Sequence, residues 1–275
     1  MPSQPNKRRR HPSSNRSAEA TKHGRPDRRK SQGSSYRSFA LIHEDSHILA
    51  VSKPDGLLVT MAESNEQTLQ DQVRKHTRKS PEPDAQLPSA VHRLDRYTSG
   101  IVLFGRTKRG LDGLSRLIRE NEMQKQYYLL TVGDLPENNG RIDIPLKAIE
   151  AGKKRMIAAK SNDIGAQESI TDFEVEERLR DPSGQAYTLV RATLLTGRTH
   201  QLRVHFSEIG YPIAGDSIYG VKGPNRFLRE RAKLLRQFLH ARQLEFDHPV
   251  TGQHLQLQAK LPKDLVKILH FLRGK

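Results

Sequence analysis

Hydrophobic and polar residues alternate along several short segments of the chain, which is the pattern of half-buried β-strands. The segment 38–59, SFALIHEDSHILAVSKPDGLLV, contains two such runs that are separated by the triplet at 44–46, and it ends in a turn at 54–56. The sequence therefore predicts two short strands joined in a hairpin. Further strands are expected at 101–106, 125–133, 141–146, 168–178, 186–196 and 241–249.

Apolar residues at helical spacing predict several helices. In 108–121 four apolar residues fall on one helical face, and in 200–210 three do. Other helices are expected at 67–78, 229–239 and 263–273, whereas the proline-rich stretch 80–88 is expected to be a loop. Strands outnumber helices and do not alternate regularly with them. We therefore expect an α+β fold with a mixed, largely antiparallel β-sheet and flanking helices.

The first 38 residues have a different composition from the rest. They contain no Leu, Ile, Val, Phe or Trp, and eleven Lys or Arg residues are opposed only by Glu19 and Asp27. Such a segment cannot bury enough apolar surface to offset the entropy of ordering it. We predict a disordered basic tail at 1–38 and one folded domain at 39–275. The run KRRR at 7–10 is compatible with a nuclear import signal or with an arm that binds RNA.

The charge of the chain indicates a polyanionic partner. The net charge is +16 with a pI near 10.1, and the predicted domain is basic even without the tail. Nucleic acid is the first candidate partner, and an ordinary enzyme with a basic tail is the alternative.

Composition also excludes several classes of protein. The absence of cysteine excludes disulfides and thiol chemistry. No apolar run approaches the roughly 20 residues of a membrane span, and the N-terminal region has no apolar signal core. We expect a cytoplasmic monomer.

Familiar metal and nucleotide motifs do not account for the sequence. HEDSH at 43–47 has the spacing of the H-E-x-x-H zinc motif, but that motif requires a helix and the flanking residues are strand-like. No glycine-rich phosphate loop occurs, and TSG at 98–100 lacks the G-x-S-x-G nucleophile elbow. We therefore expect no metal and no cofactor.

The segment 91–107, VHRLDRYTSGIVLFGRT, places one carboxylate in an unusual position. Asp95 lies between Arg93 and Arg96, directly before an apolar strand. Nearby cations favour the ionised form of a carboxylate, and an ionised carboxylate can serve as a nucleophile or an electrostatic anchor. The alternative is a surface salt bridge, which is common and contributes little energy.

A second polar cluster lies in 194–206, LLTGRTHQLRVHF. Thr199 can cap the helix predicted after it, and Arg198 and Arg203 lie close by in the sequence. A helix N-terminus near arginines is a natural anion site. The anion could be an RNA phosphate or an internal carboxylate such as Asp95, and a solvated polar turn is the alternative.

The strand predicted at 125–133 carries adjacent tyrosines. Alternation places Tyr128 on one face with Leu130, and Tyr127 on the other with Lys125. This pattern favours Tyr128 as the core tyrosine. It leaves the Tyr127 phenol on a mixed face where it could meet a ligand, although a structural role is the alternative.

Five segments together resemble the RluA-type pseudouridine synthases. In chain order they are HRLDRYTSG, KQYYLLTVG, TGRTHQLRVHF, GYPIAGDSIYG and FLHARQLEFDHPVTG. The resemblance extends from about residue 40 to residue 262. It implies the pseudouridine synthase fold with a central active-site cleft. It also implies isomerisation of uridine to pseudouridine within RNA, without cofactor or metal.

The resemblance assigns roles to particular residues. Asp95 would be the nucleophile, Tyr127 would stack on the uracil and help to remove its C5 proton, and Arg203 would pair with Asp95. Arg93 is a candidate for filling the gap left in the stack when the base flips out, and Arg198 could share the task of Arg203. The residues expected to bind RNA or support the site are His92, Arg93, Arg96, Lys125 and Arg198.

Several alternatives remain open at this stage. Nothing before residue 39 resembles the RNA-binding domain that many family members carry, so the chain resembles the shorter members, and both rRNA and tRNA are candidate substrates. The basic segment 221–236 could contact RNA or form a solvated helix face. A non-catalytic RNA-binding factor is the main rival function. A carboxylate glycosidase would require a second acid near Asp95.

Overall fold

Twelve β-strands and five α-helices make up the described part of the chain. The computed structural model describes residues 39–60, 66–149 and 155–275, and the basic tail expected at 1–38 lies outside them. The strands are β1 (Ala40–Glu44), β2 (Ile48–Lys53), β3 (Ala85–Ala90), β4 (Ser99–Thr107), β5 (Gln124–Val132), β6 (Asn139–Asp143), β7 (Leu146–Ile149), β8 (Arg155–Ala158), β9 (Ile170–Arg180), β10 (Ala186–Leu194), β11 (Leu239–Asp247) and β12 (His254–Gln258). The helices are α1 (Leu69–His76), α2 (Lys108–Arg119), α3 (Gln201–Glu208), α4 (Lys222–Ala232) and α5 (Lys263–Leu272).

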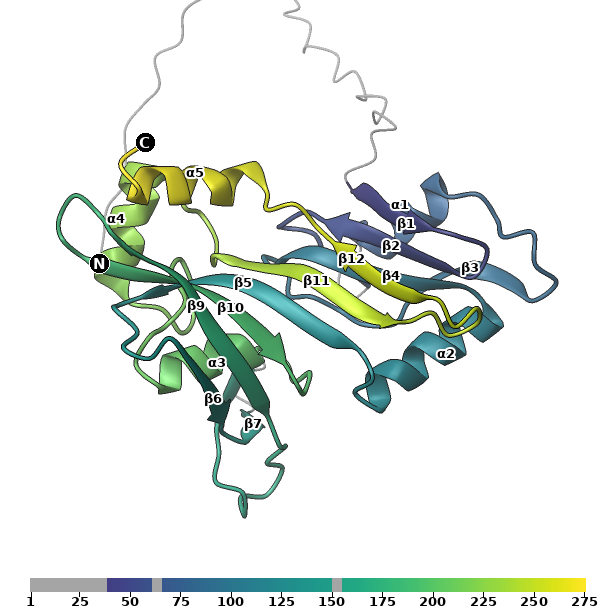
Figure 1. The fold of residues 1–275 in the computed structure, drawn as a ribbon, viewed down its shortest axis with the longest axis horizontal. Helices are drawn as coiled ribbons and strands as arrows, with labels where there is room; N and C mark the ends of the chain where they lie inside the picture. Colours follow the sequence, from purple (N-terminus) through teal and green to yellow (C-terminus); the bar gives the residue numbers. More distant parts are fainter. Residues whose placement is uncertain (1–38, 61–65, 150–154) are drawn as a thin grey trace, which may run out of the picture. The chain divides into compact units, whose positions relative to one another are not determined.

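Ten of these strands form one sheet (Figure 1). Its order is β1-β2-β4-β11-β5-β10-β9-β6, with β12 paired to β11 and β3 paired to β4. β4 and β11 are parallel, and the other paired strands of the sheet are antiparallel. The expected α+β class with a mixed, largely antiparallel sheet is confirmed.

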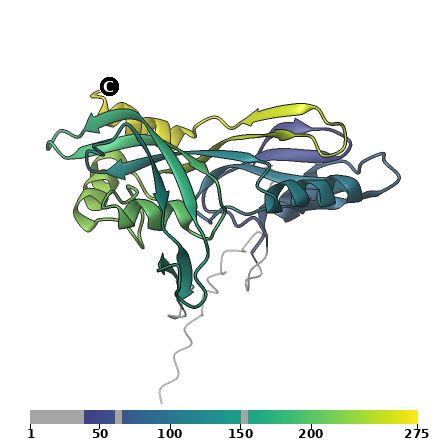
Figure 2. The same ribbon diagram turned by 60° about the horizontal axis from the view of Figure 1, so that its bottom comes forward.

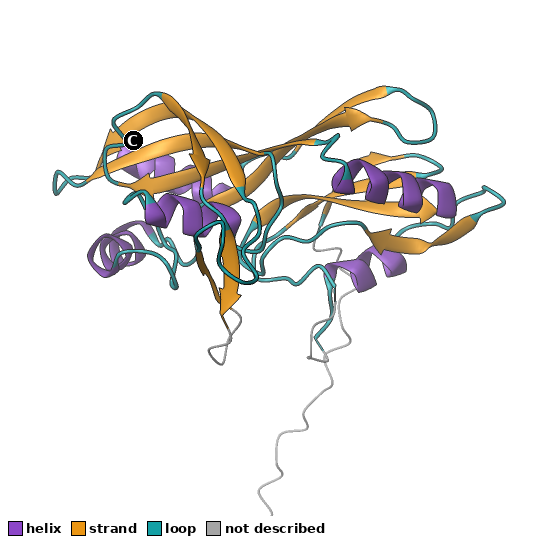
Figure 3. Cartoon of the chain, turned by 90° about the horizontal axis from the view of Figure 1, so that it is seen from below, coloured by secondary structure: helices purple, strands orange, loops and turns teal. Residues whose placement is uncertain are grey.

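Helices cover both faces of the sheet. Successive residues of a strand point to opposite faces, and in the central strands they pack in different hydrophobic clusters. On β4, Leu103 packs in a cluster with α2, whereas Val102 packs in a cluster with α1. On β5, Leu130 packs with α4 and α5, whereas Leu129 packs with α3. Helices α1 and α3 thus lie on one face, and α2, α4 and α5 lie on the other. Figures 2 and 3 show helices lying against the strands from two further directions.

The parallel contact between β4 and β11 requires glycine at position 100. Gly100 has φ +121°, and a Cβ at this position would overlap the backbone of Ala241. Only glycine tolerates both the positive φ and the close approach. The contact therefore brings the loop before β4 next to the start of β11.

Some predicted elements are wrong in detail. The expected loop 80–88 overlaps β3, an edge strand with a register shift between Ala85 and Ser89, where Pro88, a residue without an N–H, is tolerated. The helix expected at 229–239 is α4, at 222–232, because Lys233 adopts a left-handed conformation that ends it. Strands β7, β8 and β12 were not predicted as separate strands.

The HEDSH segment forms the turn of the predicted hairpin between β1 and β2. The Asp45 carboxylate accepts the backbone N–H groups of His47 and Ile48 at 2.7 and 2.8 Å, which closes the turn. Within the described ranges, no group of three or more His, Asp or Glu side chains is arranged to hold a metal ion.

Strands β7 and β8 form a separate two-stranded sheet. Leu146 on β7 and Met156 on β8 bury their side chains against Val204 of α3, with Tyr219 packed beside them. This contact attaches the small sheet to the helix that follows the second polar cluster of the sequence. None of the helices in 39–60, 66–149 and 155–275 is long and apolar enough to cross a membrane.

Candidate active site

The loop before β4 is held by side chains from two other parts of the chain. The buried Lys53 ammonium donates to the Arg96 carbonyl at 3.0 Å, and Arg236 donates to the Tyr97 carbonyl at 3.1 Å. Gln237 donates to the Thr98 hydroxyl at 3.2 Å. Burial lowers the pKa of Lys53 to about 7, against the effect of neighbouring carboxylates. The loop is therefore fixed at its backbone, while the Asp95 side chain remains partly exposed.

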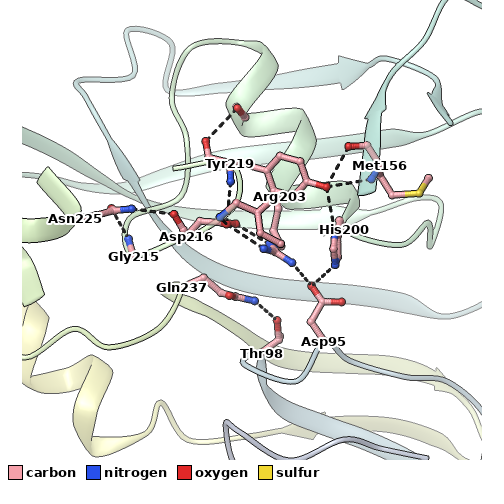
Figure 4. Close-up of polar contacts among 12 residues, drawn as sticks. Asp95, Thr98, Met156, His200, Arg203, Gly215, Asp216, Tyr219, Asn225 and Gln237 are labelled. Atoms are coloured by element: carbon pink, nitrogen blue, oxygen red, sulfur yellow. Dashed lines mark hydrogen bonds and ion pairs between the residues drawn. The ribbon is translucent and has the colours of Figure 1, made fainter. Parts of the chain in front are cut away.

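Asp95 faces two basic side chains that lie more than 100 residues later in the sequence (Figure 4). Arg203 Nη1 donates to Asp95 Oδ2 at 3.0 Å, and His200 Nε2 lies 3.7 Å from the same oxygen. The Arg203 side chain is 5% exposed and that of Asp95 is 22% exposed. A buried cation thus meets the carboxylate from the protein side and leaves part of it accessible.

A second carboxylate fixes the orientation of Arg203. Arg203 Nε and Nη2 donate to the two oxygens of Asp216 at 2.6 and 2.9 Å, which is a bidentate pair (Figure 4). The Asp216 side chain is fully buried. Burial alone would raise the pKa of the Asp216 carboxyl, but Arg203 and the N–H groups of Ile218 and Tyr219 together hold it below its usual value. The Arg203 guanidinium can therefore direct only its remaining edge to Asp95.

Tyr127 lies on β5 at the junction of two hydrophobic clusters. It is partly buried and packs against the cluster around α3 and the cluster around α1. Burial raises the pKa of the Tyr127 phenol, and the Asp95 charge adds to this effect. The expectation that Tyr128 is the core tyrosine is wrong, because both faces of the sheet are covered and the Tyr127 side chain packs against both of these clusters.

A pocket of about 180 Å³ lies between the Asp95 loop and the start of α3. It brings together five of the eight residues that the sequence singled out. Its lining residues are Arg93, Leu94, Asp95, Thr98, Tyr127, Leu194, Gly197, Arg198, Thr199, His200, Gln201, Leu202, Arg203 and Leu239. Apolar, aromatic and charged groups therefore surround one small volume, which is the usual composition of a small-molecule site.

Three of the singled-out residues do not line the pocket. His92 Nε2 accepts the Leu103 N–H at 3.1 Å, and burial lowers the pKa of His92 to about 4. Arg96 pairs with Glu66 at 2.7 Å. Lys125 is partly buried, and burial lowers its pKa. These side chains surround the site without facing the pocket.

The structure corrects two local interpretations of the sequence. The arginines adjacent to Asp95 are not its ion-pair partners: Arg96 turns to Glu66, and Arg93 is exposed at the pocket. Thr199 does not cap α3, because His200 is the N-cap residue and provides no side-chain cap. Arg198 donates its Nε to the Glu168 carbonyl at 3.0 Å, so the pairing with Asp95 falls to Arg203.

Sequence reasoning missed Asp216 and Tyr219, and it gave His200 no separate role. Both Asp216 and Tyr219 lie in GYPIAGDSIYG, which carried part of the family resemblance. Asp216 had a detectable signal, since an acidic residue in an apolar stretch needs a cationic partner if it is buried. Nothing local in the sequence indicates that this partner is Arg203.

Comparisons with known proteins identify the family of the chain. The sequence profile of the RNA pseudouridylate synthase family matches residues 47–208. Ribosomal large subunit pseudouridine synthase D of Pseudomonas aeruginosa is 33% identical over 243 residues, which cover 85% of this chain and 71% of that protein. Ribosomal large subunit pseudouridine synthase C of Salmonella typhi is 36% identical over 237 residues, covering 86% and 70%.

A solved structure shows the same relationship. Human RNA Pseudouridylate Synthase Domain Containing 4 superposes with a TM-score of 0.66 at 26% sequence identity, covering 85% of this chain and 93% of that one. The chain therefore belongs to the RNA pseudouridylate synthase family, whose members are isomerases that act on RNA. The resemblance to RluA-type synthases that the sequence motifs indicated is confirmed.

We predict that Asp216→Asn destabilises the fold by about 3 kcal/mol at neutral pH, because it leaves the buried Arg203 without its anion. The folded-state pKa of Asp216 lies below its ordinary value of 3.8. The stabilisation is therefore complete well above pH 4 and is lost as the pH falls through the folded-state pKa. Urea unfolding from pH 7 to pH 3 should show the wild type approaching the variant.

The control for this experiment is Asp112→Asn, which removes an exposed ion pair with Lys108 on α2. It should change stability by less than about 1 kcal/mol. A stability difference between wild type and Asp216→Asn that is small at pH 7, or constant down to pH 3, would contradict the role assigned to the buried pair.

Proposed function

We propose that Asp95 is the nucleophile in the conversion of specific uridines in RNA to pseudouridine. The observation that carries this proposal is the accessible carboxylate of Asp95 held by the buried Asp216–Arg203 pair at the wall of the pocket. A nucleophile must be oriented and accessible at once, and this arrangement meets both conditions. The pocket would be the active-site cleft that the sequence led us to expect.

The reaction exchanges one bond to the ribose for another. The bond between C1′ and N1 of uracil breaks, a bond between C1′ and C5 forms, C5 loses a proton, and N1 gains one. A uridine inside a stack cannot reach Asp95, so it must flip into the pocket, at a cost of a few kcal/mol. Arg93, which is exposed at the pocket, is suited to occupy the vacated position. Confinement in a small pocket keeps the detached uracil near C1′.

Tyr127 is proposed to stack on the uracil and to assist removal of the C5 proton. Its packing between two clusters provides a fixed aromatic surface beside Asp95. Because burial raises its pKa, the phenol stays protonated.

Ribosomal RNA is the substrate we propose first, because both curated relatives are named as synthases of the large ribosomal subunit. Transfer RNA is the second candidate. A cytoplasmic location fits ribosomal RNA in a bacterial cell. The residues assembled around the pocket come from one chain, and we propose that the monomer is active without metal or cofactor.

The surface of α4 is proposed to bind the RNA backbone outside the pocket. Lys222, Arg226, Arg229, Arg231 and Lys233 are exposed and form no ion pair with the described residues. On α2, by contrast, the four cations Lys108, Arg109, Arg116 and Arg119 all pair with carboxylates. Unpaired cations are free to replace counterions on phosphates. The eleven cations of residues 1–38 are proposed to add to this binding.

Asp95→Asn should abolish product formation while leaving RNA binding within about twofold. The amide retains the shape of the carboxylate and can no longer act as a nucleophile, so we expect a loss of at least about a thousandfold. Ribosomal RNA labelled with tritium at uridine C5 reports the reaction through tritium release. Asp112→Asn is the matched control. Turnover by Asp95→Asn at a normal rate would refute the assignment.

Tyr127→Phe should retain substrate affinity but slow the single-turnover rate by about a hundredfold, since the ring remains and only the hydroxyl is lost. The same tritium-release assay measures the rate under enzyme excess, and a filter-binding assay measures affinity. Tyr128→Phe, which removes a hydroxyl from the next residue of β5, is the control. Equal rates for wild type and Tyr127→Phe would exclude a role for the phenol.

Replacing Arg226, Arg229 and Arg231 of α4 with Gln should weaken RNA binding and flatten its salt dependence. The slope of log Kd against log salt should fall by about 2, because each lost phosphate contact removes about 0.7–0.9. The control replaces Lys108, Arg109 and Arg116 of α2, which changes net charge equally. Equal slopes for the two triple variants would argue against an α4 surface. A chain lacking residues 1–37 tests the tail in the same titration.

A further inference from the structure

The hydroxyl group of Tyr219 has three polar partners near the candidate nucleophile (Figure 4). Its oxygen accepts the Met156 N–H at 3.1 Å and lies 3.0 Å from the Met156 carbonyl oxygen. It also lies 3.0 Å from His200 Nδ1. Met156 belongs to β8, and His200 Nε2 is the nitrogen that lies 3.7 Å from Asp95. Tyr219 therefore connects the small β7–β8 sheet with the groups that face Asp95.

The single proton of a phenol limits what these three contacts can be at one time. If Tyr219 donates to the Met156 carbonyl, His200 Nδ1 must carry a proton and donate to the phenol oxygen. If Tyr219 donates to Nδ1, a neutral His200 carries its proton on Nε2, on the side of Asp95. The direction of the Tyr219 hydroxyl and the choice of protonated ring nitrogen in His200 are therefore coupled.

The surroundings of His200 favour the second arrangement. Burial lowers the pKa of His200, although the Asp95 charge opposes this, so the neutral ring is favoured. A neutral ring protonated at Nδ1 would direct an Nε2 lone pair at the Asp95 carboxylate, which is repulsive. A ring protonated at Nε2 directs an N–H to that carboxylate instead. The distance of 3.7 Å is too long for a hydrogen bond, and such contacts tighten when substrate binds.

The backbone at His200 supports a specific placement of its ring. His200 has φ +56° and ψ +16°, a left-handed conformation that is uncommon for residues other than glycine. It immediately precedes α3 and forms no side-chain cap to that helix. The His200 side chain therefore does not cap α3. Its imidazole lies between Tyr219 and Asp95 instead.

The ring of Tyr219 also contacts the cation that holds Asp95. The Arg203 guanidinium lies 5.1 Å from the centre of the Tyr219 ring, and that of Arg155 on β8 lies 5.2 Å from it. Both distances are within the range of cation–π contacts. Tyr219 therefore touches both basic groups that face Asp95, one through its ring and the other through its hydroxyl.

We propose that Tyr219 is a positioning residue for the isomerisation, which directs the Nε2–H of His200 toward Asp95 and anchors this arrangement to β8. The proposal rests on the role proposed for Asp95. In it, Asp95 is oriented from two sides, by Arg203 under the control of Asp216 and by His200 under the control of Tyr219. Tyr219 touches neither the substrate nor the reacting atoms.

The first test measures the protonation of His200 without substrate. Nitrogen NMR of the imidazole should show Nε2–H with an Nδ1 lone pair that accepts a hydrogen bond in the wild type, and Tyr219→Phe should shift the Nδ1 resonance toward that of a free lone pair. The control is Tyr211→Phe, which removes another partly buried hydroxyl, one without a hydrogen bond to the described residues. A His200 signal unchanged in Tyr219→Phe would overturn the proposal, and this readout does not depend on any RNA.

The second test is a double-mutant cycle with His200. With His200 present, Tyr219→Phe should lower the single-turnover rate about tenfold and leave RNA affinity within about twofold. In the His200→Ala background, the same substitution should lower the rate less than about twofold. His200→Gln, whose amide can replace the Nε2 donor, should be faster than His200→Ala. An equal rate loss in both backgrounds would reduce Tyr219 to a structural residue and overturn the proposal.

The two experiments separate this proposal from the proposed function. If the wild type releases no tritium from any RNA, the proposed function fails, and the NMR measurement still decides whether Tyr219 controls His200. If the wild type is active and the cycle is additive, the proposed function stands and the positioning role of Tyr219 is wrong.

Discussion

The site depends on one buried ion pair, between Asp216 and Arg203. Removing two charges from water is costly, and the pair persists because Arg203 and the backbone N–H groups of Ile218 and Tyr219 donate four hydrogen bonds to the Asp216 carboxylate. The guanidinium cannot rotate without breaking two of these bonds. Its free edge is therefore fixed, and Asp95 receives a donor at a set position. Such a pair contributes specificity of geometry more than stability.

The sheet supplies the second constraint, because it brings distant segments to one place. The parallel contact of β4 and β11 at Gly100 places the Asp95 loop beside the residues that precede and begin β11. The loop is then held by Arg236, which donates to the Tyr97 carbonyl, and by Gln237, which donates to the Thr98 hydroxyl. The α3 and α1 clusters meet at Tyr127, so the pocket has one wall from each half of the sheet. A reacting group on a loop gains rigidity from these anchors.

Charge is arranged differently inside the site and outside it. At Asp95, the cation Arg203 is buried and paired with two carboxylates, which fixes its geometry. On α4 the cations are exposed and have no partner among the described residues, which suits contacts with a flexible polyanion. The two kinds of cation correspond to two needs of an RNA-modifying enzyme. The buried cation orients the reacting carboxylate, and the exposed cations are suited to bind the RNA backbone.

The sequence by itself determined which residues could do chemistry, and only the tertiary structure decided which of them meet. Alternation and helical spacing predicted most strands and helices, since these patterns reflect local burial, and the motifs indicated Asp95, Tyr127 and Arg203. The prediction that the sequence neighbours of Asp95 are its cationic partners was wrong, because adjacent side chains in a loop point in different directions. Arg96 pairs with Glu66, and the partner of Asp95 comes from α3. Asp216 and Tyr219 were invisible as partners for the same reason, since hydrogen bonds between distant segments leave no local pattern in the chain.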